Sequence, residues 1–210
     1  MGALLHNEHV LIIPSPIVLG DEYTISCRIF SPFFENPKFK TICQGSNGIG
    51  GLLVINGNCT QLGTFTIGDE PFYIDSGIKL QEICEKERWY HFAMSYSNKA
   101  EIQTDEGTKR TEMVIFYIDG VKTSEVVNLD GHYHYSLGKD IGYIGNSKDF
   151  NEPCGFICDF KVVNKFFQFK DKLPDYIINT EHAGITNLFD IFNHLQKDEN
   201  NYKGVVSFEF

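Results

Sequence analysis

The chain has 210 residues, of which 42% are hydrophobic and 22% charged, so it can fold around one large core or two small ones. Its formal net charge of −10 argues against a polyanionic partner, because nucleic acids and anionic membranes are bound through Lys and Arg. No apolar run approaches the ~20 residues of a membrane-spanning helix. We therefore expect no membrane insertion, and from the charge no nucleic-acid binding.

The N-terminal sequence MGALLHNEHV lacks the basic segment and apolar stretch of a signal peptide. The six cysteines are spread along the chain without a Cys-x-x-Cys pair, which is typical neither of a disulfide scaffold nor of a structural zinc site. Cys27 shares its face of a predicted strand with Ile25 and Ile29, as a reduced core cysteine does. We therefore expect reduced thiols and favour an intracellular location, while three disulfides and a secreted chain stay open as the alternative.

From residue 9 to residue 163, short runs of β-forming residues alternate with turn residues. The runs include YTISCRIF (23–30), RWYHFAMSY (88–96), MVIFYIDG (113–120) and GFICDFKVV (155–163). Many short strands with few helical segments between them predict an all-β fold, which we expect to be a two-sheet antiparallel jelly-roll sandwich. Pro14-Ser15-Pro16 is predicted to be a connection, and the polar segment 98–112 a long exposed hairpin loop.

The run at 113–118 is unusual because both of its faces are apolar. Its two sets of side chains are Val114, Phe116 and Ile118 on one side, and Met113, Ile115 and Tyr117 on the other. A strand with one wet face should alternate between apolar and polar residues, so a further layer must cover this one. Asp119-Gly120 predicts a hairpin turn directly after it, since Gly accepts the positive φ that such a turn needs.

Helical periodicity is confined to the C-terminal part of the chain. Leu188, Phe192 and Leu195 recur at spacings of four and three, so residues 187–197 predict a short amphipathic helix before a last strand in GVVSFEF. We expect residues 1–170 to form the jelly roll and residues 171–210 a C-terminal extension packed on the same domain. The helix and the loop before it are one candidate cover for the strand at 113–118, and a second sheet with aromatic lining is the other.

The order of these features resembles the laminin G-like and pentraxin-like modules of the concanavalin A-like lectin/glucanase superfamily. RWYHFAMSY followed by VIFYIDGVKTSEV is similar to their Trp-x-His strand and Tyr-x-Asp-Gly hairpin, and IGYIGNS with PCGFICDFKVVNKFF is similar to their closing strands. The resemblance covers most of residues 3–167 and implies the concanavalin A-like jelly roll. It also implies structural roles for Trp89, His91, Asp119, Gly120, Gly145 and Gly155. Trp89 would anchor the two sheets, since a buried aromatic side chain covers a large area, and the glycines would permit turns or close strand contacts.

Enzymes of this superfamily provide a test for catalysis. Laminarinase-like glycoside hydrolases carry Glu-x-Asp-x-x-Glu on one strand, which places a nucleophile and an acid on one concave face. The sequence lacks this motif. Its nearest partial match has Glu82, Glu85 and Glu87 but no central Asp. No Gly-x-Ser-x-Gly elbow is present, and His132 and His134 have no evident third metal ligand nearby. We therefore predict no catalytic residues, and a glycoside hydrolase is the least favoured alternative.

The resemblance also implies a rim site for calcium, because many such modules bind Ca²⁺ through Asp, Asn and carbonyl oxygens of loops. Oxygen ligands of this kind suit Ca²⁺, and the candidates here are Asp69, Glu70 and Asp149, with Asn146 near the last. Calcium is the one cofactor that we retain, and ordinary charged surface loops are the favoured explanation of these residues.

We expect a non-catalytic recognition module that binds a glycan or a protein through rim loops or a sheet face. The alternative is a protein-interaction or scaffold domain of a larger intracellular protein, since modules of this fold occur beside the helical repeats of neurobeachin-like BEACH proteins.

Overall fold

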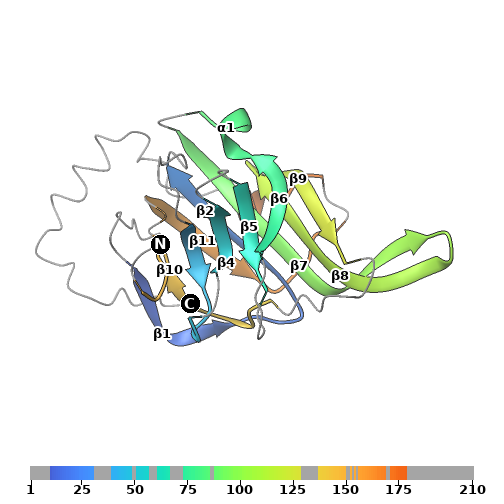
Figure 1. Ribbon diagram of the computed structural model, residues 1–210, viewed down its shortest axis with the longest axis horizontal. Coiled ribbons are helices and arrows are strands. Elements are labelled where there is room, and N and C mark those ends of the chain that lie inside the picture. Colours follow the sequence, from blue (N-terminus) through green and yellow to red (C-terminus); the bar gives the residue numbers. More distant parts are fainter. Residues whose placement is uncertain are drawn as a thin grey trace, which may run out of the picture.

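Two antiparallel β-sheets lie face to face (Figure 1). The computed structural model describes residues 10–30, 39–48, 51–56, 61–66, 73–85, 88–128, 137–149, 152, 154, 156–168 and 171–178. The six-stranded sheet contains, in spatial order, β1 (Leu11–Val18), β10 (Asp140–Ile144), β3 (Lys40–Gln44), β4 (Gly51–Asn56), β5 (Gln61–Phe65) and β6 (Tyr73–Lys79). The five-stranded sheet contains β11 (Ile157–Val163), β2 (Glu22–Phe30), β7 (Trp89–Thr104), β8 (Gly107–Ile118) and β9 (Val121–Val127). The predicted all-β, two-sheet antiparallel sandwich is confirmed.

The helices of the described residues are short. They are α1 (Leu80–Ile83), after β6, and α2 (Asp175–Ile178), after β11. Neither is long and apolar enough to cross a membrane. The predicted helix at 187–197 lies outside the described residues.

The main core lies between the sheets and follows from the alternation of side chains along each strand. Ile25 and Ile29 of β2 and Phe92 and Met94 of β7 point towards the six-stranded sheet and are fully buried. Leu53 of β4 belongs to the same cluster from the opposite side. Each fully buried side chain of this size contributes about 1.5–3 kcal/mol to folding, so this cluster is the largest stabilising contribution among the described residues.

β8 is buried on both faces, as its sequence predicts. Val114 and Phe116 join the core between the sheets. Met113, Ile115 and Tyr117 face the other way and belong to a second apolar cluster. We call the face of the five-stranded sheet that is turned away from the six-stranded sheet the outer face.

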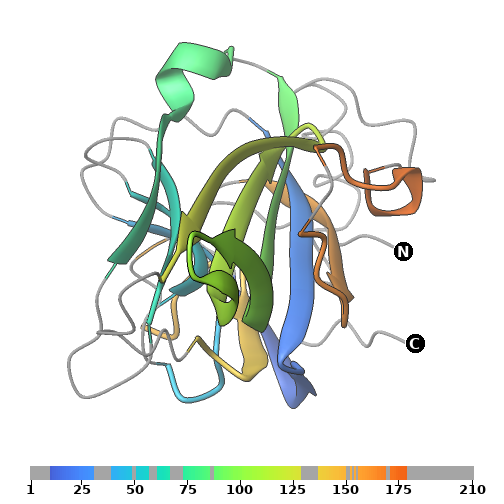
Figure 2. The same ribbon diagram turned by 90° about the vertical axis from the view of Figure 1, so that its right-hand side faces the viewer.

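The cover of the outer face is the segment 164–178, which we call the strap and of which residues 164–168 and 171–178 are described. Phe167, Leu173 and Ile177 of the strap complete the second cluster against β8. Figure 2 shows the α2 end of the strap, in orange, beside the five-stranded sheet and away from the strands of the other sheet. Among the described residues, the cover is thus the chain that precedes the predicted helix. Residues 171–178 belong to the predicted C-terminal extension and pack on the five-stranded sheet, while the division at residue 170 stays a prediction.

The segment 98–112 forms strands instead of the predicted loop. β7 and β8 remain paired from Ala100↔Thr111 to Thr104↔Gly107, with a two-residue turn at 105–106 and Gly107 at φ 116°. We call residues 98–112 the arm, and Figure 1 shows it extending past the ends of the neighbouring strands. Its polar composition concealed the strands, because this part of the ribbon lies outside the core between the sheets.

β1 also differs from expectation, because it continues through Pro14-Ser15-Pro16. It is the edge strand of its sheet, and its register with β10 is irregular between Ile12 and Ile17. At an edge or a bulge, a proline removes no ladder hydrogen bond that a neighbour requires.

The five described cysteines are free thiols. Cys27, Cys43, Cys84 and Cys154 are buried, and Cys158 is half-buried. Burial raises the pKa of Cys154 to about 12 and that of Cys27 well above its ordinary range.

Native protein should therefore leave Cys27, Cys43, Cys84 and Cys154 unmodified by iodoacetamide near neutral pH, whereas guanidinium-unfolded protein should be labelled at all four. Both a thiolate and solvent access are needed for the reaction, and burial removes both. Peptide mass spectrometry identifies the labelled sites. A disulfide-linked peptide containing any of the four, in protein purified without reductant, would contradict the structure.

Leu173→Ala should lower the free energy of unfolding by about 2–5 kcal/mol, because it empties a buried position between the strap and β8. Its exposed neighbour provides the control, since Lys172→Ala should change stability by no more than about 0.5 kcal/mol. Urea unfolding followed by circular dichroism measures both. Wild-type stability in Leu173→Ala would mean that the strap is not part of the cooperatively folded unit.

Candidate functional site

The predicted calcium ligands fall in different parts of the structure. Asp69 and Glu70 lie outside the described residues, and Asp149 is an exposed turn residue after β10. Asn146 is fully buried, and its Oδ1 accepts hydrogen bonds from the backbone N–H groups of Ser147 (2.8 Å) and Glu152 (2.9 Å). Its amide oxygen is therefore turned inward, away from the rim. In the described part of the chain, no group of three or more His, Cys, Asp or Glu side chains could hold a metal ion.

The other candidates for chemistry are equally scattered. Glu82 and Glu85 are exposed. Glu82 Oε1 lies 3.8 Å from Lys79 Nζ, and both side chains of this ion pair are exposed to solvent. Glu87, His132 and His134 lie outside the described residues, as does Gly155. Gly145 has φ 88° and donates its N–H to the carbonyl of Ile42 (2.8 Å), so it turns the chain at the end of β10.

The turn at Asp119-Gly120 is present, with φ 48° and 76° at its two residues. The Asp119 carboxylate accepts a hydrogen bond from the N–H of His91 (2.9 Å), and the Asp119 N–H donates to the carbonyl of His91 (2.7 Å). Asp119 thus fastens the turn to β7.

Six side chains from three adjacent strands gather on the outer face, next to this turn. We call them the Arg28 cluster: Ser26 and Arg28 of β2, Trp89 and His91 of β7, and Asp159 and Lys161 of β11. The register explains the gathering, because Arg28 is paired with His91 across β2 and β7, and Ser26 with Lys161 across β2 and β11. Between Cys158 and Lys161 that register is irregular, and Asp159 has φ 54°. Asp159 Oδ2 lies 4.0 Å from Arg28 Nε and 3.7 Å from Lys161 Nζ.

Most of the buried polar atoms that lack a hydrogen-bond partner, among the described residues, belong to the Arg28 cluster. Eight buried side-chain nitrogen and oxygen atoms lack a hydrogen-bond partner, and six of them belong to this cluster. They are Ser26 Oγ, Arg28 Nε, Trp89 Nε1, Asp159 Oδ2 and both ring nitrogens of His91. A buried polar group without a partner costs about 1–3 kcal/mol, so such groups are rare in folded proteins and seldom adjacent. Their concentration in one place marks the cluster as the candidate site.

An apolar wall borders the cluster. The rings of Phe30 and Trp89 are 5.5 Å apart and those of Phe30 and Phe156 6.5 Å apart, both edge to face. Cys158 packs against the same group, which is separate from the two larger clusters. Trp89 therefore lies on the outer face. This differs from our expectation that it would anchor the two sheets. Tyr90 and Phe92, on the opposite side of β7, point into the core between the sheets.

His91 is the most strongly perturbed group of the cluster. Its side chain is fully buried, and burial lowers its pKa to about 4, with the positive charges of Arg28 and Lys161 acting in the same direction. The backbone carbonyl of Ile177 faces the ring and acts in the opposite direction on this pKa, although its contact does not meet the geometry of a hydrogen bond. At neutral pH His91 is consequently uncharged, with one ring nitrogen as a donor and the other as an acceptor.

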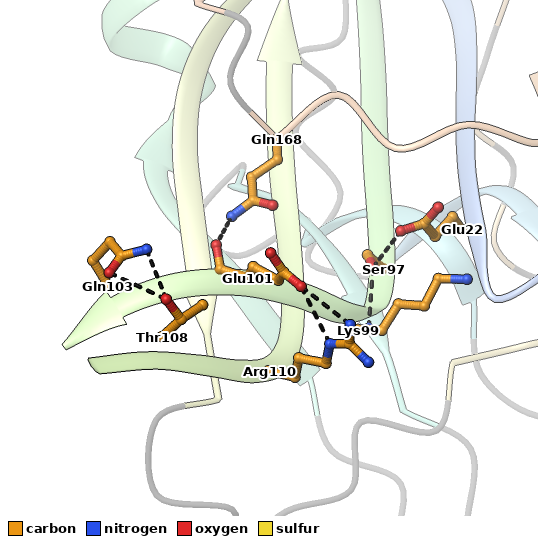
Figure 3. A network of polar contacts seen from close by, with 8 residues as sticks. All are labelled: Glu22, Ser97, Lys99, Glu101, Gln103, Thr108, Arg110 and Gln168. Carbon is orange, nitrogen blue, oxygen red and sulfur yellow. Dashed lines mark hydrogen bonds and ion pairs between the residues drawn. The ribbon is translucent and has the colours of Figure 1, made fainter. Parts of the chain in front are cut away.

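A second polar group lies at the arm (Figure 3). Arg110 Nε and Glu101 Oε1 are 3.3 Å apart across the ribbon, and Gln103 Nε2 donates to Thr108 Oγ1 (3.0 Å). Gln168 of the strap donates to the carbonyl of Glu101. These side chains are exposed, so their contacts contribute little stability. The arm is thus a charged, accessible ribbon fastened to the strap.

Sequence reasoning singled out Trp89 and His91 but missed Ser26, Arg28, Asp159 and Lys161. The available signal was the alternation in SCRIF and CDFKVV, which places each pair of polar residues on one side of a strand. Alternation alone cannot bring two strands together, and β2 and β11 are more than a hundred residues apart in the chain.

His91 gives the site a pH dependence that can be measured. Its native pKa of about 4 lies below the ordinary value of about 6.5, so between these values the unfolded chain binds a proton that the folded chain does not. Stability should therefore fall as the pH decreases from about 6.5 to about 4, by roughly 3 kcal/mol from this residue. His91→Leu should lose that part of the pH dependence, measured by urea unfolding at about pH 7 and about pH 4.5. Parallel pH profiles for wild type and His91→Leu would contradict a depressed pKa.

No family model and no curated protein matches the sequence. A heptameric SAP-like pentraxin from Limulus polyphemus is similar in structure, with 16% identity and a TM-score of 0.49 over 79% of this chain and 76% of the pentraxin chain. Domain 4 of AbnA, an extracellular arabinanase from Geobacillus stearothermophilus solved with arabinotriose, has 16% identity and a TM-score of 0.48 over 84% of this chain and 74% of that domain. Domains LG4-5 of the mouse laminin alpha1 chain have 12% identity and a TM-score of 0.41 over 77% of this chain, which spans 40% of their length. With TM-scores below 0.5 and identities of 12–16%, these similarities show no family for this chain and assign no ligand to it.

Proposed function

We propose that this chain is a non-catalytic recognition module that binds a glycan at the Arg28 cluster. The observation that carries the proposal is the group of six buried polar atoms without hydrogen-bond partners, beside the aromatic wall of Phe30, Trp89 and Phe156. Binding sites for small molecules combine apolar walls with a few convergent polar groups in this way. The cluster is also accessible in part, since the Arg28 side chain is 27% exposed and that of Lys161 26%.

The mixture of donors and acceptors favours a saccharide. Arg28 Nε and Trp89 Nε1 can only donate, Asp159 Oδ2 accepts, and neutral His91 offers one of each. A sugar hydroxyl is both a donor and an acceptor, so neighbouring hydroxyls can satisfy such a mixture. The flat, apolar ring of Trp89 adds a surface on which the C–H side of a sugar can pack.

The same geometry disfavours bond cleavage. Glycoside hydrolysis requires two carboxyl groups on opposite sides of the scissile bond. The cluster contains one, Asp159, which lies beside two cations, while the nearby Asp119 accepts a hydrogen bond from backbone. Further along the outer face, the strap covers Ile115 and Tyr117.

A second candidate is a protein-interaction domain, and the arm favours it. The arm reaches beyond the last pair that β7 makes with β2 (Glu22↔Ser97) and the last that β8 makes with β9 (Met113↔Val127). A projecting ribbon of exposed charged residues is accessible to another chain, and rim charges of this kind serve chiefly to speed association.

The glycan proposal can be tested through Trp89, because it is the single tryptophan of the chain and lies in the proposed site. Titration with a panel of neutral and acidic oligosaccharides should give a saturable change in tryptophan fluorescence for at least one member. The same incubations should release no new reducing ends. Asp159→Asn should weaken binding by about 10–100-fold, as expected for loss of a charged hydrogen-bond acceptor.

Arg110→Gln is the matched control, since it removes an exposed charge on the arm and should leave saccharide affinity unchanged. A panel without any saturable change, or equal affinity in Asp159→Asn and wild type, would overturn the proposal. A blank panel together with loss of a protein complex in Arg110→Gln would favour the second candidate. Release of reducing ends would contradict a non-catalytic module.

A further inference from the structure

The end of the strap lies directly against the Arg28 cluster. Arg28 Nη2 donates to the carbonyl of Ile178 (3.0 Å), and Lys161 Nζ donates to the carbonyl of Ile177 (3.2 Å). Both carbonyls belong to the last residues of α2, where a helix leaves its carbonyl groups without intrahelical partners. The two cations of the cluster therefore cap the end of the strap.

The middle of the strap is held by different contacts. Phe167 is fixed through both of its backbone groups, because its carbonyl accepts from Tyr117 Oη (2.7 Å) and its N–H donates to Ser95 Oγ (3.0 Å). The N–H of Leu173 donates to the carbonyl of Gly120 (2.7 Å), and the N–H of Lys122 to the carbonyl of Asp171 (2.7 Å). None of these contacts involves the Arg28 cluster. The end and the middle of the strap are therefore held by separate sets of contacts, which is the condition for one to open without the other.

The closed position of the end is sterically specific. A Cβ atom at Gly120 would lie 2.2 Å from Cδ1 of Ile178, so the Ile178 side chain rests on the bare backbone of the β8–β9 turn. Ile177 is buried in the second apolar cluster, and its carbonyl is close enough to His91 to influence its ionisation. Residues 177 and 178 consequently form a cover over one side of the cluster.

We propose that the end of the strap, residues 175–178, is an internal competitor that regulates access to the Arg28 cluster. With the end docked, the carbonyls of Ile177 and Ile178 occupy hydrogen-bond donors of Arg28 and Lys161 that a ligand would otherwise use. With the end released, both cations and His91 become available. This inference rests on the proposed function of the cluster, and it adds that ligand binding and docking of the end oppose each other.

The test uses Ile178→Ala, which removes the side chain that rests on Gly120, and Ile177→Ala, which empties a buried position and weakens docking further. The matched control is Val127→Ala, which trims a residue of the same apolar cluster on β9, opposite Met113 and away from the Arg28 cluster.

The first measurement needs no ligand. Proton NMR follows the titration of His91, whose resonance is assigned with His91→Gln, and hydrogen exchange follows the peptide that contains 175–178.

In wild type and Val127→Ala, the pKa of His91 should be near 4, and in the two strap variants it should rise towards its ordinary value of about 6.5 as the ring becomes solvated. Exchange at 175–178 should accelerate in the same two variants. Oligosaccharide affinity should then increase by about tenfold, because less binding energy is spent on opening the site.

An unchanged His91 titration and unchanged exchange in both strap variants would overturn the inference. So would weaker saccharide binding in a variant whose end is released, since the strap would then be part of the site. If no oligosaccharide binds to wild type, the proposed function fails, whereas the titration of His91 still decides whether the end opens.

Discussion

The burial of β8 on both faces is the constraint on which the rest of the structure depends. One apolar side of this strand is satisfied by the six-stranded sheet, and the other requires a third layer because water cannot cover Met113, Ile115 and Tyr117 without a large free-energy cost. The strap supplies that layer. A strap of irregular backbone brings carbonyl and N–H groups onto the sheet, and these need partners of their own.

This requirement explains the polar residues of the outer face. Tyr117 Oη and Ser95 Oγ bind the backbone of Phe167, and Thr24 Oγ1 donates to the carbonyl of Lys165 (2.7 Å). Arg28 does the same for the last turn of α2. These polar side chains stabilise the interface between the strap and the sheet, because each forms a hydrogen bond with a backbone group of the strap that loses its contact with water.

At the end of the strap, some buried polar groups of the outer face have no hydrogen-bond partner. The candidate site lies there. Beneath the middle of the strap, apolar contacts and backbone hydrogen bonds account for the outer face. At its end, His91 and Asp159 retain hydrogen-bonding capacity that the described residues do not fulfil, and Asp159 has a left-handed backbone conformation that is unfavourable for a residue other than glycine. Unfulfilled polar groups and local strain persist only where the surrounding structure is stable enough to offset them. Here the two apolar clusters on either side of β8 provide that stability.

The strands, the turn at Asp119-Gly120 and the two-faced character of β8 could be predicted from the sequence, because alternation and turn preference involve residues a few positions apart. The arm could not, since most of its side chains are polar or charged, as in the Glu101–Arg110 ion pair, and only Ala100 and Ile102 reach the second apolar cluster. The face of Trp89 could not be predicted either: both sides of RWYHFAMSY carry aromatic residues, and only the order of the layers decides which side meets the other sheet.

The sequence by itself thus determined an all-β chain with a strand that needs two covers. The tertiary structure decided which segment provides the second cover and where its end meets Arg28, His91 and Asp159. The physical reason is that these contacts join β2, β7 and β11, whose register is set by cooperative packing of the whole sheet and not by the residues adjacent to each strand.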